Sequence, residues 1–171
     1  MEKTTIPVNI EGLPCAIPSE NEQLFTWYDS QKSFGVCFLY PLDFIKRNTE
    51  IPGNIFLTGV SYGGRELSSA SMEIDIEPAN GLTTEEFAQN AAAKAGPGLE
   101  STLYQIILPD DVTAMKTESL PGQAASRTIY VVNNDVAFTL TFMPLDQTNQ
   151  DAWVDMERIY SLFSLTWEFT R

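Results

Sequence analysis

The sequence predicts an α+β domain in which helices pack on an antiparallel β-sheet, and three observations support this class. Segments rich in β-branched and aromatic residues follow one another in pairs, as in β-hairpins. Only two segments have the spacing of amphipathic helices, which is too few to connect the strands of a parallel sheet. Residues 69–77 alternate between apolar and polar side chains, which is typical of an antiparallel strand with one face toward solvent.

The N-terminal half is expected to contribute four strands. Residues 24–28 and 34–40 form a hairpin with a five-residue loop, because a polar stretch separates two runs rich in aromatic and β-branched residues. Residues 55–61 and 69–77 are the next two strands. We expect residues 42–53 to be a loop, because a proline, a glycine and several charges interrupt that stretch.

The first helix carries the strongest local signal in the chain. Thr83 and Glu86 have the spacing of a capping box, and Leu82 and Phe87 are placed to form a hydrophobic staple. A run of alanines continues the helix until residues 96–97, Gly-Pro, end it. The small alanine side chains would let this helix approach a sheet closely.

The C-terminal half is expected to contain five strands and a second helix. Residues 133–135 (Asn-Asn-Asp) turn a long hairpin, since these residue types tolerate positive φ. The second helix carries an apolar stripe on one side, and a short alternating segment after it predicts a final strand. In chain order these elements span residues 104–108, 112–118, 124–132, 136–142, 150–163 and 165–169.

Composition and charge restrict the classes of function. The 171 residues include 23 acidic and 10 basic side chains and no histidine, so the net charge is -13 at neutral pH. Phosphate groups of nucleic acids and anionic lipid head groups repel such a polyanion, and we expect no nucleic-acid partner. The missing histidine removes the commonest general base, the usual catalytic zinc ligand and every Ser–His or Cys–His pair. We therefore predict no catalytic residues and no cofactor.

The chain is expected to be one domain with an N-terminal arm. Residues 1–23 combine prolines and a glycine with short apolar pieces, as in a tether, and residues 24–171 form a single globular domain. The sequence has no apolar run long enough to span a bilayer and no signal-peptide pattern. The protein is then either cytoplasmic or an export product from which a signal or lipid anchor has been removed, and we favour the second. Any membrane attachment would be through that removed anchor.

Two cysteines bear on this location. Cys15 lies in a proline-flanked extended segment and Cys37 in an apolar strand. A disulfide between them would close a loop of about 22 residues, hold the N-terminal arm and contribute roughly 3 kcal/mol in the chain-entropy model. We predict this disulfide and an oxidising compartment. Two independent free thiols, with Cys37 as a small core residue, are the alternative.

Two patterns resemble sites that carry chemistry. Residues 59–63 match the G-x-S-x-G nucleophile elbow, but no histidine exists to accept the proton of Ser61 and a strand rather than a helix follows, so we interpret the match as coincidence. Glu73, Asp75 and Glu77 place three carboxylates on one face of a strand, as a cation or paired-carboxylate site requires. The solvent-facing side of a sheet explains them equally, and Glu73 and Asp75 are kept as candidate metal ligands.

Three further residues are candidates for binding. Tyr62 and Arg65 lie in the glycine-containing turn after the third strand. Arg127 lies inside a strand and could direct its guanidinium toward an anionic group. A salt bridge from Arg127 to an acid on a neighbouring strand is the alternative.

Five segments within residues 24–163 carry a family resemblance: Phe34–Pro41, Thr83–Phe87, Leu120–Ala124, Phe138–Phe142 and Trp153–Phe163. In these segments the sequence resembles the PsbP-like superfamily. That group includes the extrinsic photosystem II subunit PsbP, a Ran-binding nuclear transport factor, and bacterial exported or lipid-anchored proteins of unknown role. The resemblance implies an α/β/α sandwich around an antiparallel sheet and no shared catalytic residues.

These observations favour a non-enzymatic, exported accessory or binding domain whose partner is a protein or a small molecule. Two alternatives stay open. A histidine-free hydrolase could use carboxylates, in which case two carboxyl groups should converge in a cleft and one should have a raised pKa. A cytoplasmic regulator could bind a basic protein surface, in which case its complex should be sensitive to salt.

Overall fold

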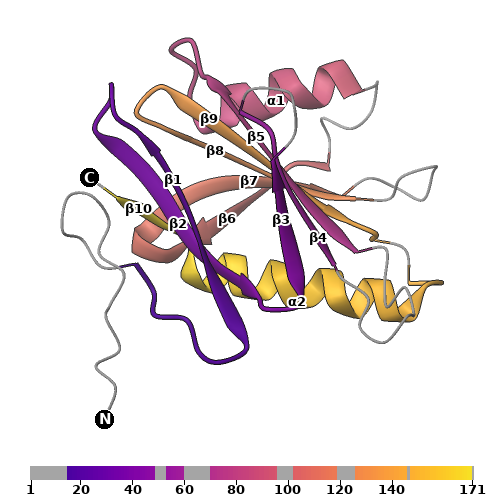
Figure 1. Ribbon diagram of the computed structural model, residues 1–171. Coiled ribbons are helices and arrows are strands. Elements are labelled where there is room, and N and C mark those ends of the chain that lie inside the picture. Colours follow the sequence, from indigo (N-terminus) through magenta and orange to yellow (C-terminus); the bar gives the residue numbers. More distant parts are fainter. Residues whose placement is uncertain are drawn as a thin grey trace.

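The computed structural model describes residues 15–48, 53–59, 70–95, 102–118, 126–145 and 147–170 (Figure 1). These residues form ten β-strands and two α-helices, and the strands divide between two antiparallel sheets. The predicted α+β class, with antiparallel pairing and helices packed on a sheet, is confirmed. The sequence predicts one sheet, and the structure has two.

The smaller sheet consists of β1 (Glu22–Asp29), β2 (Phe34–Pro41) and β10 (Glu168–Thr170), with β2 in the middle. β1 and β2 form the predicted hairpin. Every residue of β2 is buried, because strands flank it on both edges and α2 (Gln150–Thr166) packs on it. The apolar sequence of β2 follows from this position.

The larger sheet has seven strands, each antiparallel to its neighbours. Asn134 and Asp135 turn the β8–β9 hairpin with φ values of 52° and 58°, as the sequence predicts. From one edge to the other the order is β3 (Phe44–Asn48), β4 (Ile55–Gly59), β5 (Ser71–Pro78), β9 (Val136–Met143), β8 (Arg127–Asn133), β7 (Val112–Glu118) and β6 (Tyr104–Leu108).

The edge strand β3 corrects the expectation of a loop over residues 42–53. Phe44 is 2% exposed and belongs to the main core, and the Lys46 ammonium lies 5.0 Å from the centre of the Phe25 ring. Lys46 and Arg47 give the stretch a loop-like composition. Charged side chains are nevertheless common on edge strands, because they discourage pairing with other chains.

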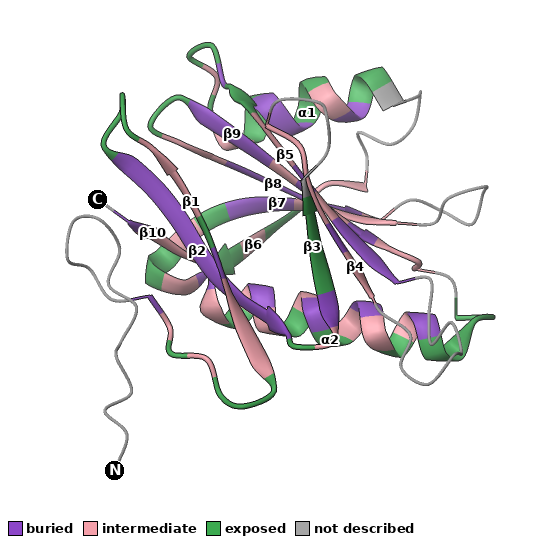
Figure 2. Cartoon of the chain, viewed as in Figure 1, coloured by how far each residue is buried: buried purple, intermediate pink, exposed green. Residues whose placement is uncertain are grey.

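The larger sheet separates two layers. α1 (Thr84–Ala95) packs on one face against β7 and β8, while α2 and the smaller sheet pack on the other and enclose the main core. Figure 1 shows the two helices on opposite sides of the sheet, and Figure 2 shows most of the buried residues on β2, on the central strands and on the inner side of α2. We call the side covered by α1 the α1 face. Neither helix is long and apolar enough to span a membrane.

The end of α2 differs from the sequence expectation. The alternation of residues 165–169 predicts a strand, yet the helix continues to Thr166 and Leu165 is 75% exposed. Trp167 is fully buried and lies four residues after Phe163, so it extends the apolar stripe of the helix. The backbone N–H of Trp167 donates to the Phe163 carbonyl at 2.9 Å. The final strand exists, but only as β10.

Candidate functional site

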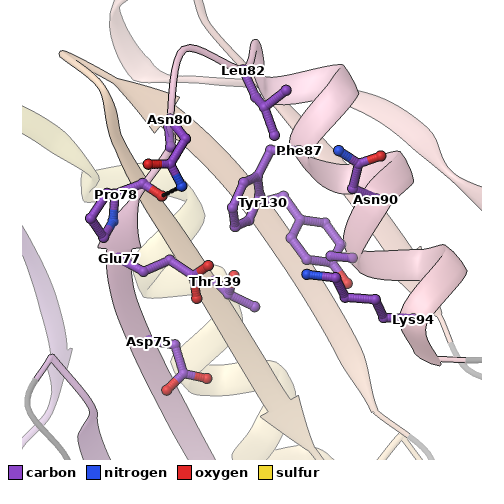
Figure 3. Close-up of a pocket in the computed structure, with 12 residues that line it drawn as sticks. Asp75, Glu77, Pro78, Asn80, Leu82, Phe87, Asn90, Lys94, Tyr130 and Thr139 are labelled. Atoms are coloured by element: carbon purple, nitrogen blue, oxygen red, sulfur yellow. Dashed lines mark hydrogen bonds between the residues drawn. The ribbon is translucent and has the colours of Figure 1, made fainter.

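A cleft of about 330 Å³ opens on the α1 face, between α1 and β5. Its volume is at the lower end of the range for small-molecule sites. The lining combines two carboxylates, an ammonium, amides, hydroxyls and apolar side chains (Figure 3). We call it the α1–β5 cleft.

β5 provides the acidic wall of this cleft. Asp75 and Glu77 are two residues apart on a strand, so both side chains lie on the α1 face. Thr139 of β9 lies opposite Asp75 and adds a hydroxyl. Ile74 directly precedes Asp75 in the strand. Its side chain is 1% exposed and lies on the opposite face of the sheet. The alternation predicted for this strand is confirmed.

α1 provides the opposite wall. The helix residues that line it are Phe87, Asn90, Ala91 and Lys94. The last three lie three, four and seven positions after Phe87 and therefore share one side of the helix with it. This side turns toward β5 because the helix packs its neighbouring side on β7 and β8.

The start of α1 is held by the predicted capping box. The Glu86 N–H donates to Thr83 Oγ1 at 3.2 Å, and the Thr83 N–H donates to Glu86 Oε2 at 2.9 Å. Hydrogen bonds from the backbone and side chain of Thr83 lower the pKa of the Glu86 carboxyl. The helix is thus fixed where the cleft begins.

Two further hydrogen bonds attach this end of α1 to the β8–β9 hairpin. The Val132 N–H donates to Thr84 Oγ1 at 3.0 Å, and the Gly81 N–H donates to Asp135 Oδ1 at 2.8 Å. Gly81 has a φ of 77°, which glycine adopts without strain. The start of α1 is therefore attached to the hairpin that contains β9, the strand next to β5.

An aromatic pair forms the floor of the cleft. The rings of Phe87 and Tyr130 meet edge to face, with centroids 6.3 Å apart. Tyr130 is only 6% exposed, yet its hydroxyl has no hydrogen-bond partner among the described residues. Figure 3 shows this hydroxyl directed toward the Lys94 end of the cleft. Burial raises the pKa of Tyr130, so the phenol is neutral at physiological pH.

The charged groups of the cleft differ in their partners. Asp75 accepts a hydrogen bond from the Asn54 amide. Glu77 and Lys94 lie on opposite walls, and neither forms an ion pair or hydrogen bond with another residue in the described part of the chain. The cleft therefore presents two carboxylates and one ammonium that form no ion pair within the described part of the chain, and the side chains of Glu77 and Lys94 are exposed.

The candidate metal ligands Glu73 and Asp75 share the α1 face of β5. The pKa of Glu73 is raised, first by burial and second by the charge of Asp75. Asp75 lines the cleft, but Glu73 does not. Within the described ranges, no group of three or more Asp, Glu or Cys side chains is placed to hold a metal ion.

Arg127 has the salt bridge that was its alternative role. Its Nε lies 3.0 Å from Glu118 Oε1 on the neighbouring strand β7, and a terminal nitrogen lies 2.8 Å from Glu157 Oε1 of α2. The guanidinium also stacks on Tyr160, 4.3 Å from the ring centre. Arg127 therefore joins the larger sheet to α2, on the face opposite the α1–β5 cleft.

The remaining candidates lie outside the described residues. These are Tyr62 and Arg65, together with Ser61 of the G-x-S-x-G match. Sequence reasoning missed Lys94 and Tyr130. The helical spacing of Lys94 from Phe87 was a usable signal, whereas nothing in the sequence indicated that the Tyr130 hydroxyl would lack a partner.

The predicted disulfide between Cys15 and Cys37 is present, with the two Cα atoms 6.1 Å apart. Cys37 is fully buried in the middle of β2, and Cys15 is 3% exposed. The bond therefore attaches residue 15 to the centre of the smaller sheet.

Comparisons with known proteins bear on the fold. No family model matches the sequence, and no curated protein matches it. The structure is similar to the solution structure of cyanobacterial PsbP (CyanoP) from Synechocystis sp. PCC 6803, with a TM-score of 0.52 and 10% sequence identity. The match covers 91% of this chain and 97% of that chain. The chain therefore has a PsbP-like fold.

Proposed function

We propose that this chain is a non-enzymatic accessory or binding domain that works outside the cytoplasm and holds a small ligand in the α1–β5 cleft. The observation that carries the proposal is the set of groups on the cleft walls that have no partner among the described residues: Glu77, Lys94 and the Tyr130 hydroxyl. Glu77 and Lys94 are exposed and solvated, whereas Tyr130 is only 6% exposed, and largely buried polar side chains normally have hydrogen-bond partners. A bound ligand with complementary groups would supply them.

The arrangement of these groups favours binding over catalysis. Nucleophilic catalysis needs a hydroxyl or thiol bonded to a group that removes its proton. In the described lining, neither the Thr139 nor the Tyr130 hydroxyl is hydrogen bonded to a base. The only two cysteines form the disulfide.

The disulfide supports a location outside the cytoplasm, because disulfides persist in oxidising compartments. The test is the intact mass of protein isolated from its native source, before and after reduction, with alkylation of free thiols. We expect no alkylation before reduction and two modified thiols after it. Two thiols alkylated without reduction would contradict the proposed location.

The test of binding is an NMR titration of the ¹⁵N-labelled protein with pools of small amines, carboxylic acids and zwitterions. We expect at least one pool to shift backbone signals of Glu77, Phe87, Lys94 and Tyr130 together. Pools that shift only signals remote from the cleft, or none, would contradict a ligand site there. Glu20→Gln, which removes an exposed charge away from the cleft, is the control variant.

One observation favours a carboxylate-dependent hydrolase as a second candidate. Glu73 has a raised pKa and lies beside Asp75, as an acid and base pair requires. Against it, only Asp75 of the two lines the cleft. If this candidate is correct, any hydrolysis found in a substrate screen will be abolished by Glu73→Gln and by Asp75→Asn. Activity unchanged in both variants would exclude this pair as its source.

A further inference from the structure

We propose that the ligand of the α1–β5 cleft is a small zwitterion, a free amino acid or dipeptide with an apolar side chain. Glu77 would bind its ammonium group, and Lys94 and the Tyr130 hydroxyl would bind its carboxylate. This inference rests on the proposed function, because it names the ligand class of the same cleft.

The placement of charge is the first reason. Glu77 projects from β5 and Lys94 from α1, and neither has a partner among the described residues (Figure 3). A simple amine would pair with Glu77 and leave the exposed ammonium of Lys94 with water alone. A simple carboxylate would do the reverse. A molecule with both charges satisfies both walls, and charge-assisted hydrogen bonds are the stronger kind.

Asp75 does not cancel the charge of Lys94. Its carboxylate accepts a hydrogen bond from Asn54, which holds it toward β4 and away from α1. The second carboxylate of the cleft instead increases the negative potential of the β5 wall. That potential favours an ammonium group at this wall over any anion.

The Tyr130 hydroxyl is a second and independent reason. The residue is 6% exposed, and the hydroxyl points into the cleft without a partner in the described structure. Because the phenol is neutral, it can donate a hydrogen bond to a carboxylate. It points toward the Lys94 end, so the donor and the ammonium would act on the same anionic group.

The apolar lining and the size of the cleft define the rest of the ligand. Leu82, Phe87 and Ala91 present a continuous apolar surface beside the charged groups. A cleft of about 330 Å³ suits a ligand of one or two residues rather than a nucleotide or a folded partner. An apolar or aromatic side chain would pack on Phe87.

The test is calorimetric titration of the full chain with phenylalanine and the dipeptide leucyl-phenylalanine. Phenethylamine and phenylpropionate are the matched ligands, since each keeps the ring and only one charge. We expect phenylalanine or the dipeptide to bind at least tenfold more tightly than either matched ligand. The variants Glu77→Gln, Lys94→Met and Tyr130→Phe should each weaken zwitterion binding, the two charge variants by tenfold or more.

The control variants Glu20→Gln and Arg47→Gln make the same charge changes at exposed residues outside the cleft and should bind normally. Circular dichroism will confirm that every variant is folded. Equal binding of phenethylamine and phenylalanine, with no effect of Lys94→Met, would overturn the inference in favour of an amine site. If neither zwitterion binds but another pool shifts the cleft signals, the zwitterion inference fails and the proposed function stands. If nothing shifts them, both fail.

Discussion

Reduction of the Cys15–Cys37 disulfide should destabilise the protein by an amount that its loop length sets. The bond spans 22 residues, and the chain-entropy model gives about 3 kcal/mol for a loop of that size. The effect arises mainly in the unfolded chain, because reduction gives it back the freedom that the cross-link removes. With a urea slope of about 2 kcal/mol/M, the unfolding midpoint should fall by about 1.5 M.

The assay is urea unfolding followed by tryptophan fluorescence, with and without reductant. The double variant Cys15→Ala/Cys37→Ala provides the comparison without reductant, and its midpoint should not respond to reductant. Reduced wild type should unfold close to this variant, apart from the small cavity left at Cys37, which is fully buried. A midpoint shift of less than about 0.5 M on reduction would refute the reasoning, because the bond would then not limit the unfolded chain.

Three further predictions concern stability. Arg127→Met should lower the free energy of unfolding, measured in urea, by about 1–3 kcal/mol, because it leaves two carboxylates without their guanidinium partner. Adding Glu157→Gln to this variant should recover part of that loss. The raised pKa of Glu73 means that its carboxyl supports the fold when protonated and that this contribution is lost as pH rises through the raised pKa. Glu73→Gln should therefore leave the unfolding midpoint unchanged in acid and raise it at neutral pH. A rise in acid alone would contradict this pH dependence of stability. Phe163→Ala should lower the free energy of unfolding by about 3–5 kcal/mol and Leu165→Ala by less than about 0.5 kcal/mol, because Phe163 is fully buried and Leu165 is 75% exposed. Comparable losses in the two variants would contradict the helical end of α2.

Local patterns predicted most of the elements. The capping box at Thr83 and the Asn-Asp turn at residues 134–135 occur where the sequence places them, because both depend on contacts between near neighbours in the chain. The strict alternation of β5 also predicted which side of the sheet carries Asp75 and Glu77. These signals depend mainly on residues that are close in the chain.

The errors came from tertiary contacts. The short strand β3 is stabilised by Phe44 in a core formed by distant segments, and its own charges disguise it. The division of the strands into two sheets depends on β10 returning to pair with β2, which are more than 120 residues apart in the chain. No window of the sequence contains that pairing.

The candidate site was only partly predictable. The sequence identified the acids of β5, but their role there depends on which helix lies opposite. Lys94 becomes relevant because α1 packs on β7 and β8 and presents its last turns to the cleft. The absence of a partner for Tyr130 is a property of the packed structure.

The most direct test of this account is a search for intermolecular NOEs between the ring protons of bound phenylalanine and the ring protons of Phe87 and Tyr130. These two residues form the floor of the α1–β5 cleft, and the Arg127 network lies on the opposite face of the larger sheet. We expect NOEs to both rings in the wild type and their loss in Glu77→Gln. NOEs from the ligand to Tyr160 instead, or signals that persist unchanged in Glu77→Gln, would contradict the account.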